Sequence, residues 1–452
     1  MSFLSRIVQN YTDARDRKSF SYLYTAIIGL GFFTTAITWS MYNVYVPIFL
    51  RDLIGYLDNS KLIIGIIMVI DNIAAITLQP WLGKVSDNIW TKFGRRMPFI
   101  MIGIPIAALF FGLIPTVMET LWLLILIIGG FNISMALYRA PVVALMPDLV
   151  SKEYRSRGNA VINLLGGVGS LIGLFVMAAI YKINPTLSFW IVSIVMILCL
   201  VTLYFNIREP KERVDVEVKE KVSLIDSIRN MFMDKDKSLI FILFAILSWF
   251  FAFNAIETWF STYATDPNLL GITNEADASM LLGVYSLTFI IFAIPAGLIA
   301  KKIGRKKTMM IGLIGLVTIM IPLVIFSLVD ISALRTYIFY TIPIPFWWTW
   351  EVLIDGILLF LGGMFWAFIN INSIVVVWEL AGTARLGTYT GLYYFFSATA
   401  AILSPVVAGA IFDATNISAL FLYSFIFFVL ALVLTIFIRR TGNEADEQTL
   451  AK

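Results

Sequence analysis

Twelve apolar runs divide this chain, and each is long enough to cross a lipid bilayer as an α-helix. A spanning helix needs about 20 apolar residues, and it satisfies its own backbone hydrogen bonds. The runs are too long and too evenly apolar for the alternating strands of a membrane barrel. The sequence therefore predicts an all-helical membrane protein with spans at about 21–49, 62–83, 98–117, 121–147, 159–181, 187–206, 239–263, 279–300, 308–328, 355–378, 388–412 and 416–438.

The basic residues predict how the spans are oriented. If the N-terminus faces the cytoplasm, 28 of the 33 Lys and Arg residues fall on that side, four fall on the other side, and Arg139 lies inside a span. Such an excess marks cytoplasmic loops. We therefore expect a multi-pass protein of the cell (inner) membrane with both termini in the cytoplasm. The first run has no cleavage site, so we expect it to remain in the mature protein.

Composition excludes several classes of function. The chain has no His and a single Cys199, which removes the commonest zinc ligand, the usual general base and any disulfide framework. The basic residues follow the topology, so they give no signal for nucleic-acid binding. An intramembrane transferase would need clustered acidic or His residues at one membrane face. We expect no enzyme activity, no catalytic residue, no metal and no cofactor.

A duplicated loop predicts an internal repeat. The stretch "GKVSDNIWTKFGRR" (83–96) follows the second run, and a shorter copy, "GLIAKKIGRKK" (297–307), follows the eighth. We expect two six-helix bundles, at 1–206 and at 239–452 including a short tail. Between them, 207–238 forms a charged linker, in which apolar residues at helical spacing predict a short amphipathic helix: Leu224, Ile225, Ile228, Met231 and Phe232.

These features resemble the major facilitator superfamily of transporters. The longer first loop, with "YRAPVVALMPDLVSKEYRSRGNAVINLLGGVGS" (138–170) and "LGTYTGLYYFFSATAAILSP" (386–405), is similar to bacterial members of the sucrose/proton symporter-like group. A more distant similarity is to the glycoside-pentoside-hexuronide cation symporters. The melibiose-permease branch has two Asp residues where this chain has Ala75 and Gln79, which speaks against a sodium site of that type. The resemblance implies two pseudo-symmetric bundles that alternate access to a central cavity.

The first loop is a candidate gating element. Its pattern places an acid and glycines at fixed spacing among basic residues: Gly83, Asp87, Gly94, Arg95 and Arg96. Topology alone would need only the Lys and Arg residues. A charge network that bridges helices in one conformation and opens in another would act as a latch. In the second loop Lys301 occupies the position that matches Asp87, so that copy has lost its acid.

Three ionisable residues lie well inside the spans: Asp71, Arg139 and Glu257. Each would cost roughly 2.5–3.5 kcal/mol or more facing lipid, so we expect them to face a cavity or one another. A pair of Asp71 and Arg139 that separates in one state would make protonation depend on conformation, which proton coupling requires. A static ion pair would fit the same pattern.

Polar and aromatic residues near these charges suggest a sugar site. Asn43 and Glu257 are offset by 214 residues, as the two loop glycines are, and the resemblance places their helices along the central cavity. Sugars need hydrogen-bonding groups and an aromatic face. We expect substrate contacts from Asn43, Glu257, Trp39, Tyr42, Asn72 and Asn372, with Trp249 and Trp259 near them.

These observations predict a secondary active transporter. The resemblance implies proton-coupled symport of a disaccharide or related glycoside, with the lipid bilayer, a sugar and a proton as partners, and we expect a monomer. Alternatives are a proton-driven exporter of sugars or amphipathic compounds, a sodium-coupled sugar symporter and a substrate-sensing receptor on the same scaffold. The sequence leaves the sugar and the direction of transport open.

Overall fold

The structure is a computed structural model, and it describes residues 20–209, 237–328, 350–381 and 386–438. Within these residues twelve helical segments are long and apolar enough to cross a membrane, which confirms the predicted all-helical fold. The predicted amphipathic helix of the linker lies outside the described residues. The spans are Tyr22–Ile54, Ser60–Asn88, Met97–Thr116, Leu121–Leu149, Arg157–Tyr181, Pro185–Asn206, Ser238–Ala264, Glu275–Ile303, Arg305–Ser327, Ile354–Leu380, Tyr389–Ala414 and Ile417–Ile436.

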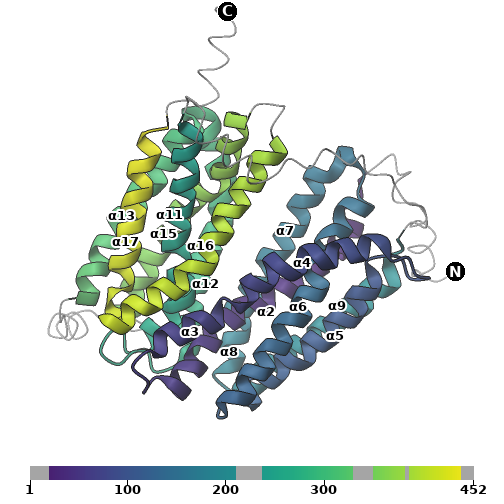
Figure 1. The fold of residues 1–452 in the computed structure, drawn as a ribbon, viewed down its shortest axis with the longest axis horizontal. Helices are drawn as coiled ribbons and strands as arrows, with labels where there is room; N and C mark the ends of the chain where they lie inside the picture. The colour runs from purple at the N-terminus through teal and green to yellow at the C-terminus, as the bar shows by residue number, and fades with distance from the viewer. Residues whose placement is uncertain (1–19, 210–236, 329–349, 382–385, 439–452) are drawn as a thin grey trace, which may run out of the picture. The chain divides into compact units, whose positions relative to one another are not determined.

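The first compact unit consists of residues 1–54 and 70–216. In it α2 packs along α7, and α5 lies between α6 and α9, while α4 packs on α6 (Figure 1). A π-helical turn, η3 (Ile172–Val176), separates α7 from α8 within the fifth span. Its helices are α2 (Tyr22–Ile54), α4 (Ile70–Asn88), α5 (Met97–Leu113), α6 (Leu121–Leu149), α7 (Arg155–Leu171), α8 (Met177–Tyr181) and α9 (Pro185–Asn206).

The second unit consists of residues 55–69 and 217–452. Its helix pairs repeat those of the first unit: α13 packs on α15 and α17 as α5 packs on α6 and α9, and α12 packs on α15 as α4 packs on α6. Its helices are α3 (Ser60–Met68), α11 (Ser238–Ala264), α12 (Glu275–Ile303), α13 (Arg305–Leu328), α15 (Trp350–Ala381), α16 (Leu386–Ala414) and α17 (Leu420–Ile436).

Local sequence signals set several helix starts. The side chain of Asn184 accepts a hydrogen bond from the backbone N–H of Leu187 at 3.0 Å, and Pro185 occupies the first helical position of α9. The side chain of Asn274 likewise accepts from the N–H of Ala276 at the start of α12. An Asn cap satisfies an N–H that the helix itself leaves unpaired, and Pro loses nothing at that position.

The second span contributes to both units. Its first half, α3, packs along α16 in the second unit, whereas its second half, α4, packs on α6 in the first (Figure 1). Together the two halves form the span that the sequence predicted at 62–83.

Candidate functional site

The first loop joins α4 to α5 and carries the predicted latch. Arg96 forms ion pairs with Asp87, in the last turn of α4, and with Asp148, near the end of α6. Arg95 forms a second ion pair with Asp148. Both arginines thus bind the carboxylate of Asp148 at the end of α6, and Arg96 also connects it to Asp87 at the end of α4. Such charge-assisted hydrogen bonds are the stronger kind.

Arg96 is the buried centre of this network, with 5% of its surface exposed. Its guanidinium also donates to the hydroxyl of Ser86 and to the carbonyl oxygen of Gly83 at 3.4 Å. A buried cation is tolerated only where its donors find acceptors. Asp87, by contrast, is half exposed at 52%, so its pairing with Arg96 is accessible to water.

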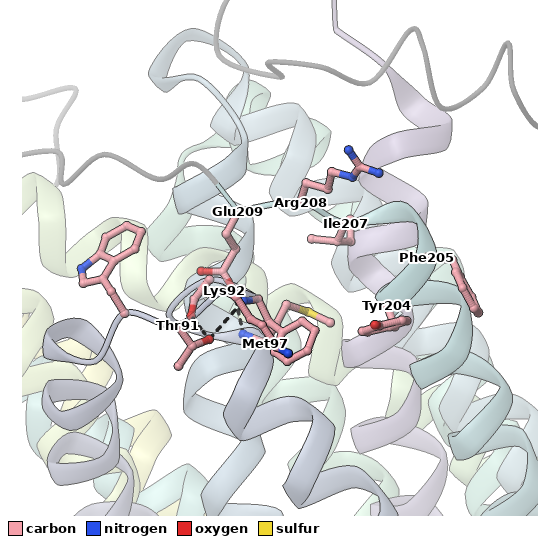
Figure 2. A pocket seen from close by; sticks show the side chains of 11 residues that line it. Thr91, Lys92, Met97, Tyr204, Phe205, Ile207, Arg208 and Glu209 are labelled. Carbon is pink, nitrogen blue, oxygen red and sulfur yellow. Dashed lines mark hydrogen bonds between the residues drawn. The ribbon is translucent and has the colours of Figure 1, made fainter.

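Glu209 completes the cluster from the end of the sixth span. Its carboxylate accepts hydrogen bonds from the backbone N–H groups of Arg95 at 2.9 Å, Arg96 at 2.9 Å and Met97 at 2.7 Å. These groups form the N-terminus of α5, where a negative charge is favoured. Figure 2 shows Glu209 reaching down to the loop.

Gly94 lets the loop approach Glu209 this closely. Its φ of +104° is a conformation that residues with a side chain rarely adopt. A Cβ atom on Gly94 would lie 2.6 Å from the Cβ and Cδ atoms of Glu209. Glycine is therefore required here both by the backbone and by the space.

The second loop repeats this arrangement with fewer ion pairs among the described residues. Arg305 forms an ion pair with Glu379, near the end of α15, as Arg95 does with Asp148 at the end of α6. Lys306 donates to the backbone carbonyl oxygens of Ile436 and Ile438, at 3.0 and 2.6 Å, where α17 ends. Each loop thus connects the start of one helix to the ends of two others in its own unit.

The charges inside the first unit lie near one another. Asp71 on α4 acts electrostatically on Arg139 of α6 and on Tyr42 of α2. The amide of Asn132 donates to the hydroxyl of Tyr42 at 3.4 Å. Three helices of this unit therefore bring an acid, a base and two neutral polar groups into one cluster. Its role in coupling stays a prediction.

Aromatic rings surround this cluster. Trp39 packs edge-on against Tyr42 and Phe131, with centroids 5.1 and 5.6 Å apart, and Tyr42 stacks on Phe131 at 5.5 Å. Asn43 and Asn72, also expected at the substrate site, are half-buried on α2 and α4. The first unit thus holds six of the residues expected near the substrate or the proton: Trp39, Tyr42, Asn43, Asp71, Asn72 and Arg139.

In the second unit Glu257 of α11 acts electrostatically on Tyr285 of α12. One turn before Glu257, Phe253 stacks on Trp366 of α15, with centroids 4.5 Å apart and planes within 1°. Asn372 is buried at 2% exposure and donates to the carbonyl oxygen of Phe368 in its own helix. Phe253 also packs near Tyr285, with ring centroids 6.3 Å apart, so the aromatic residue one turn before Glu257 contacts both α12 and α15.

Trp249 and Trp259 have a packing role instead. Both are fully buried at 0% exposure, and the indole N–H of Trp259 donates to the carbonyl oxygen of Pro405 at 3.2 Å. Phe253 and Trp366 were not singled out from the sequence, because aromatic residues are frequent throughout the chain.

A second clamp lies between α3 and α16 in the second unit. The carboxylate of Asp413 accepts from the backbone N–H groups of Lys61 at 3.1 Å and Leu62 at 2.7 Å, in the first turn of α3. Any Cβ on Gly65 would overlap the carbonyl oxygen of Pro405, and one on Gly409 would overlap that of Lys61. The helices therefore touch backbone to backbone.

Sequence reasoning missed the acids that complete these contacts: Asp148, Glu209, Glu379 and Asp413. Asp148 and Glu379 occupy matching places, at the ends of the fourth and tenth spans, so the repeat was the signal that could have found them. Glu209 directly follows the sixth span and reads as one more linker charge. Its partners are backbone groups, which have no sequence signature.

Comparisons with known proteins agree with this architecture. The Hexuronate transporter of Bacillus subtilis (strain 168) is 24% identical over 82% of this chain and 87% of its own length. The class B Tetracycline resistance protein of Escherichia coli is 24% identical over 59% of this chain and 64% of its own. The Sucrose transport protein SUC3 of Arabidopsis thaliana is 29% identical over 22% of this chain and 20% of its own length. The chain thus spans less than two thirds of two of these relatives.

Among solved structures, that of nucleoside transporter NupG has a TM-score of 0.67 and covers 93% of this chain at 15% identity, so it shows the fold alone. The sequence profile described as Major Facilitator Superfamily matches residues 28–355. This match covers more than half of the chain, and it agrees with the twelve spans and the paired loops. The chain is therefore a member of the Major Facilitator Superfamily.

Proposed function

We propose that this protein is a secondary active transporter that couples the uptake of a disaccharide or related glycoside to protons by alternating access. The observation that supports the proposal is the electrostatic interaction of Asp71 with Arg139 and Tyr42 within the spans of the first unit. An acid beside a cation is ionised, and an acid moved away from it into an apolar site takes up a proton. Conformation and protonation are then linked.

The two clamps support alternation between states. The first loop closes the ends of α4, α5 and α6 through Arg96, on the side predicted to face the cytoplasm. The second clamp holds α3 to α16 through Asp413, at the other end of the second span. A transporter that opens to one side at a time needs contacts that break at either end.

Substrate chemistry supports a sugar. In each unit a polar or acidic residue follows an aromatic residue by four positions on one helix, Asn43 after Trp39 on α2 and Glu257 after Phe253 on α11, so the two share a helix face. This combination suits hydroxyl groups and a C–H face. A proton that moves down about 100 mV supplies about 2.3 kcal/mol, enough for roughly a 40-fold sugar gradient.

The test follows external pH in weakly buffered proteoliposomes while sucrose, maltose, melibiose, raffinose and lactose are added in turn. The expected result is alkalinisation with at least one sugar, lost in Asp71→Asn. Asp52→Asn is the matched control, because Asp52 is an exposed carboxylate paired with Arg51 at the end of the first span. A labelled sugar that enters without any proton movement would contradict proton coupling and favour sodium or uniport.

A second candidate is a proton-driven exporter, and the similarity to the class B Tetracycline resistance protein favours it. The two directions are separated by the orientation of the vesicles. An exporter accumulates substrate in inside-out vesicles whose lumen has been acidified, because protons that leave the lumen drive substrate in. Deletion of the gene raises sensitivity to that substrate. A symporter for uptake accumulates substrate in right-side-out vesicles.

A further inference from the structure

A pocket of about 760 Å³ opens beside the first loop, and its lining includes Gly94 and Glu209 but none of the ion-paired side chains of the latch and none of the charges inside the spans. Its walls come from the loop before α5 and from the end of α9 with the residues that follow it. This volume lies in the range of small-molecule sites. The lining includes four aromatic side chains, Trp90, Phe93, Tyr204 and Phe205 (Figure 2).

The pocket has an excess of positive charge. Lys92 and Arg208 line it, both are exposed, and neither forms an ion pair with any residue that the structure describes. The single carboxylate in the lining, Glu209, is already used by three backbone N–H groups of α5. In Figure 2 Arg208 extends away from Glu209. Two cations are therefore left to attract an anion.

The position of the pocket at the ends of two spans favours one class of anion. α5 begins at Met97 and α9 ends at Asn206, so the pocket lies where two spans leave the membrane, on the side predicted to be cytoplasmic. Tyr and Trp prefer this interfacial depth, and anionic lipids concentrate in the cytoplasmic leaflet. A basic pocket between span ends at that depth suits a lipid headgroup.

We propose that this pocket binds the phosphate headgroup of an anionic phospholipid, with Lys92 and Arg208 attracting the phosphate and the rings of Tyr204 and Phe205 contacting the acyl chain. The ligand would lie against Gly94, Met97 and Glu209, which the latch also uses. Bound lipid would therefore stabilise the closed first loop. The site is independent of which solute the protein carries.

The test measures binding of dioleoyl phosphatidylglycerol to the full chain in detergent by native mass spectrometry, with dioleoyl phosphatidylcholine as the zwitterionic lipid with the same acyl chains. The wild-type protein should retain phosphatidylglycerol selectively. The double variant Lys92→Gln/Arg208→Gln should bind phosphatidylglycerol about 30-fold more weakly, because each of the two cations should contribute about half of this change in binding free energy. Thermal unfolding with and without each lipid gives a second readout.

The matched control is Lys301→Gln/Lys302→Gln, which removes the same charge from exposed residues of the second loop. It should retain wild-type binding. Equal losses in both double variants would overturn the proposal in favour of diffuse surface charge. Equal binding of the two lipids would also overturn it, as would full competition by inorganic phosphate, which would indicate an anion site without a lipid. The absence of any lipid-dependent shift in unfolding temperature would also overturn the proposal, because a pocket that the chain's own linker fills cannot take up lipid.

Discussion

The two loops of this transporter repeat one design and differ in how much charge they bury. In the first, Arg96 is buried among two carboxylates and Ser86. In the second, Arg305 has one acidic partner among the residues that the structure describes, Glu379, and its side chain is 36% exposed. Buried pairs cost much to break, while exposed pairs contribute about 0–1 kcal/mol. The same fold therefore contains one buried ion-pair network and one more exposed ion pair.

The ends of the sixth and twelfth spans are fastened with opposite polarity. In the first unit a carboxylate after the span, Glu209, accepts from backbone N–H groups at the start of α5. In the second unit a loop cation, Lys306, donates to backbone carbonyl groups at the end of α17. Both use the charge that a helix end favours. The two units thus make the corresponding contact with side chains of opposite charge.

The largest difference between the loops should come from their central arginines. Arg96→Ala removes the buried cation that Asp87, Asp148 and Ser86 share and leaves Asp148 with Arg95 alone, so we expect a loss of about 3 kcal/mol in stability. Arg305→Ala should cost less than about 1 kcal/mol because its pair is partly exposed. Unfolding of both variants in the same detergent measures the contrast. Equal losses would mean that burial does not distinguish the loops.

The loop glycines give a sharper contrast. Gly94→Ala forces a Cβ into Glu209 and strains a positive φ, so we expect a loss of about 2 kcal/mol. Gly304 has a φ of +89° but no atom within 4 Å of its Cβ position, so Gly304→Ala should cost about 1 kcal/mol from the backbone alone. Thermal unfolding of the two variants compares them, and a costlier Gly304→Ala would contradict the crowding argument.

The smallest effect should come from the two helix-end contacts. Glu209→Gln keeps an acceptor but removes the charge at the start of α5, for an expected loss of about 1 kcal/mol. Faster amide exchange should follow at Arg95, Arg96 and Met97. Lys306→Met should speed exchange only near the end of α17, where its acceptor carbonyl groups lie. Hydrogen exchange with peptide resolution reads both, and unchanged exchange at α5 would exclude capping by Glu209.

The sequence predicted the fold well because bilayer thickness and backbone satisfaction leave few solutions for twelve apolar runs. It also selected Asp71, Arg139 and Glu257, since charges within spans are few. It could not find Glu209 or Asp413, because their partners are backbone N–H groups at helix starts.

The measurement that tests the latch most directly compares the transport rate and the unfolding temperature of an Asp87 variant with those of the wild type. This carboxylate is half exposed, so its ion pair with Arg96 adds little to folding, yet it would have to form and break in every cycle. Asp87→Asn in proteoliposomes should slow sugar uptake about tenfold, or about 1.4 kcal/mol in the barrier, while the unfolding temperature stays within about 2 °C of wild type. Lys301→Gln, at the matching position of the second loop, should leave both unchanged. Wild-type uptake by Asp87→Asn, or a loss of uptake that merely follows a loss of stability, would contradict the latch.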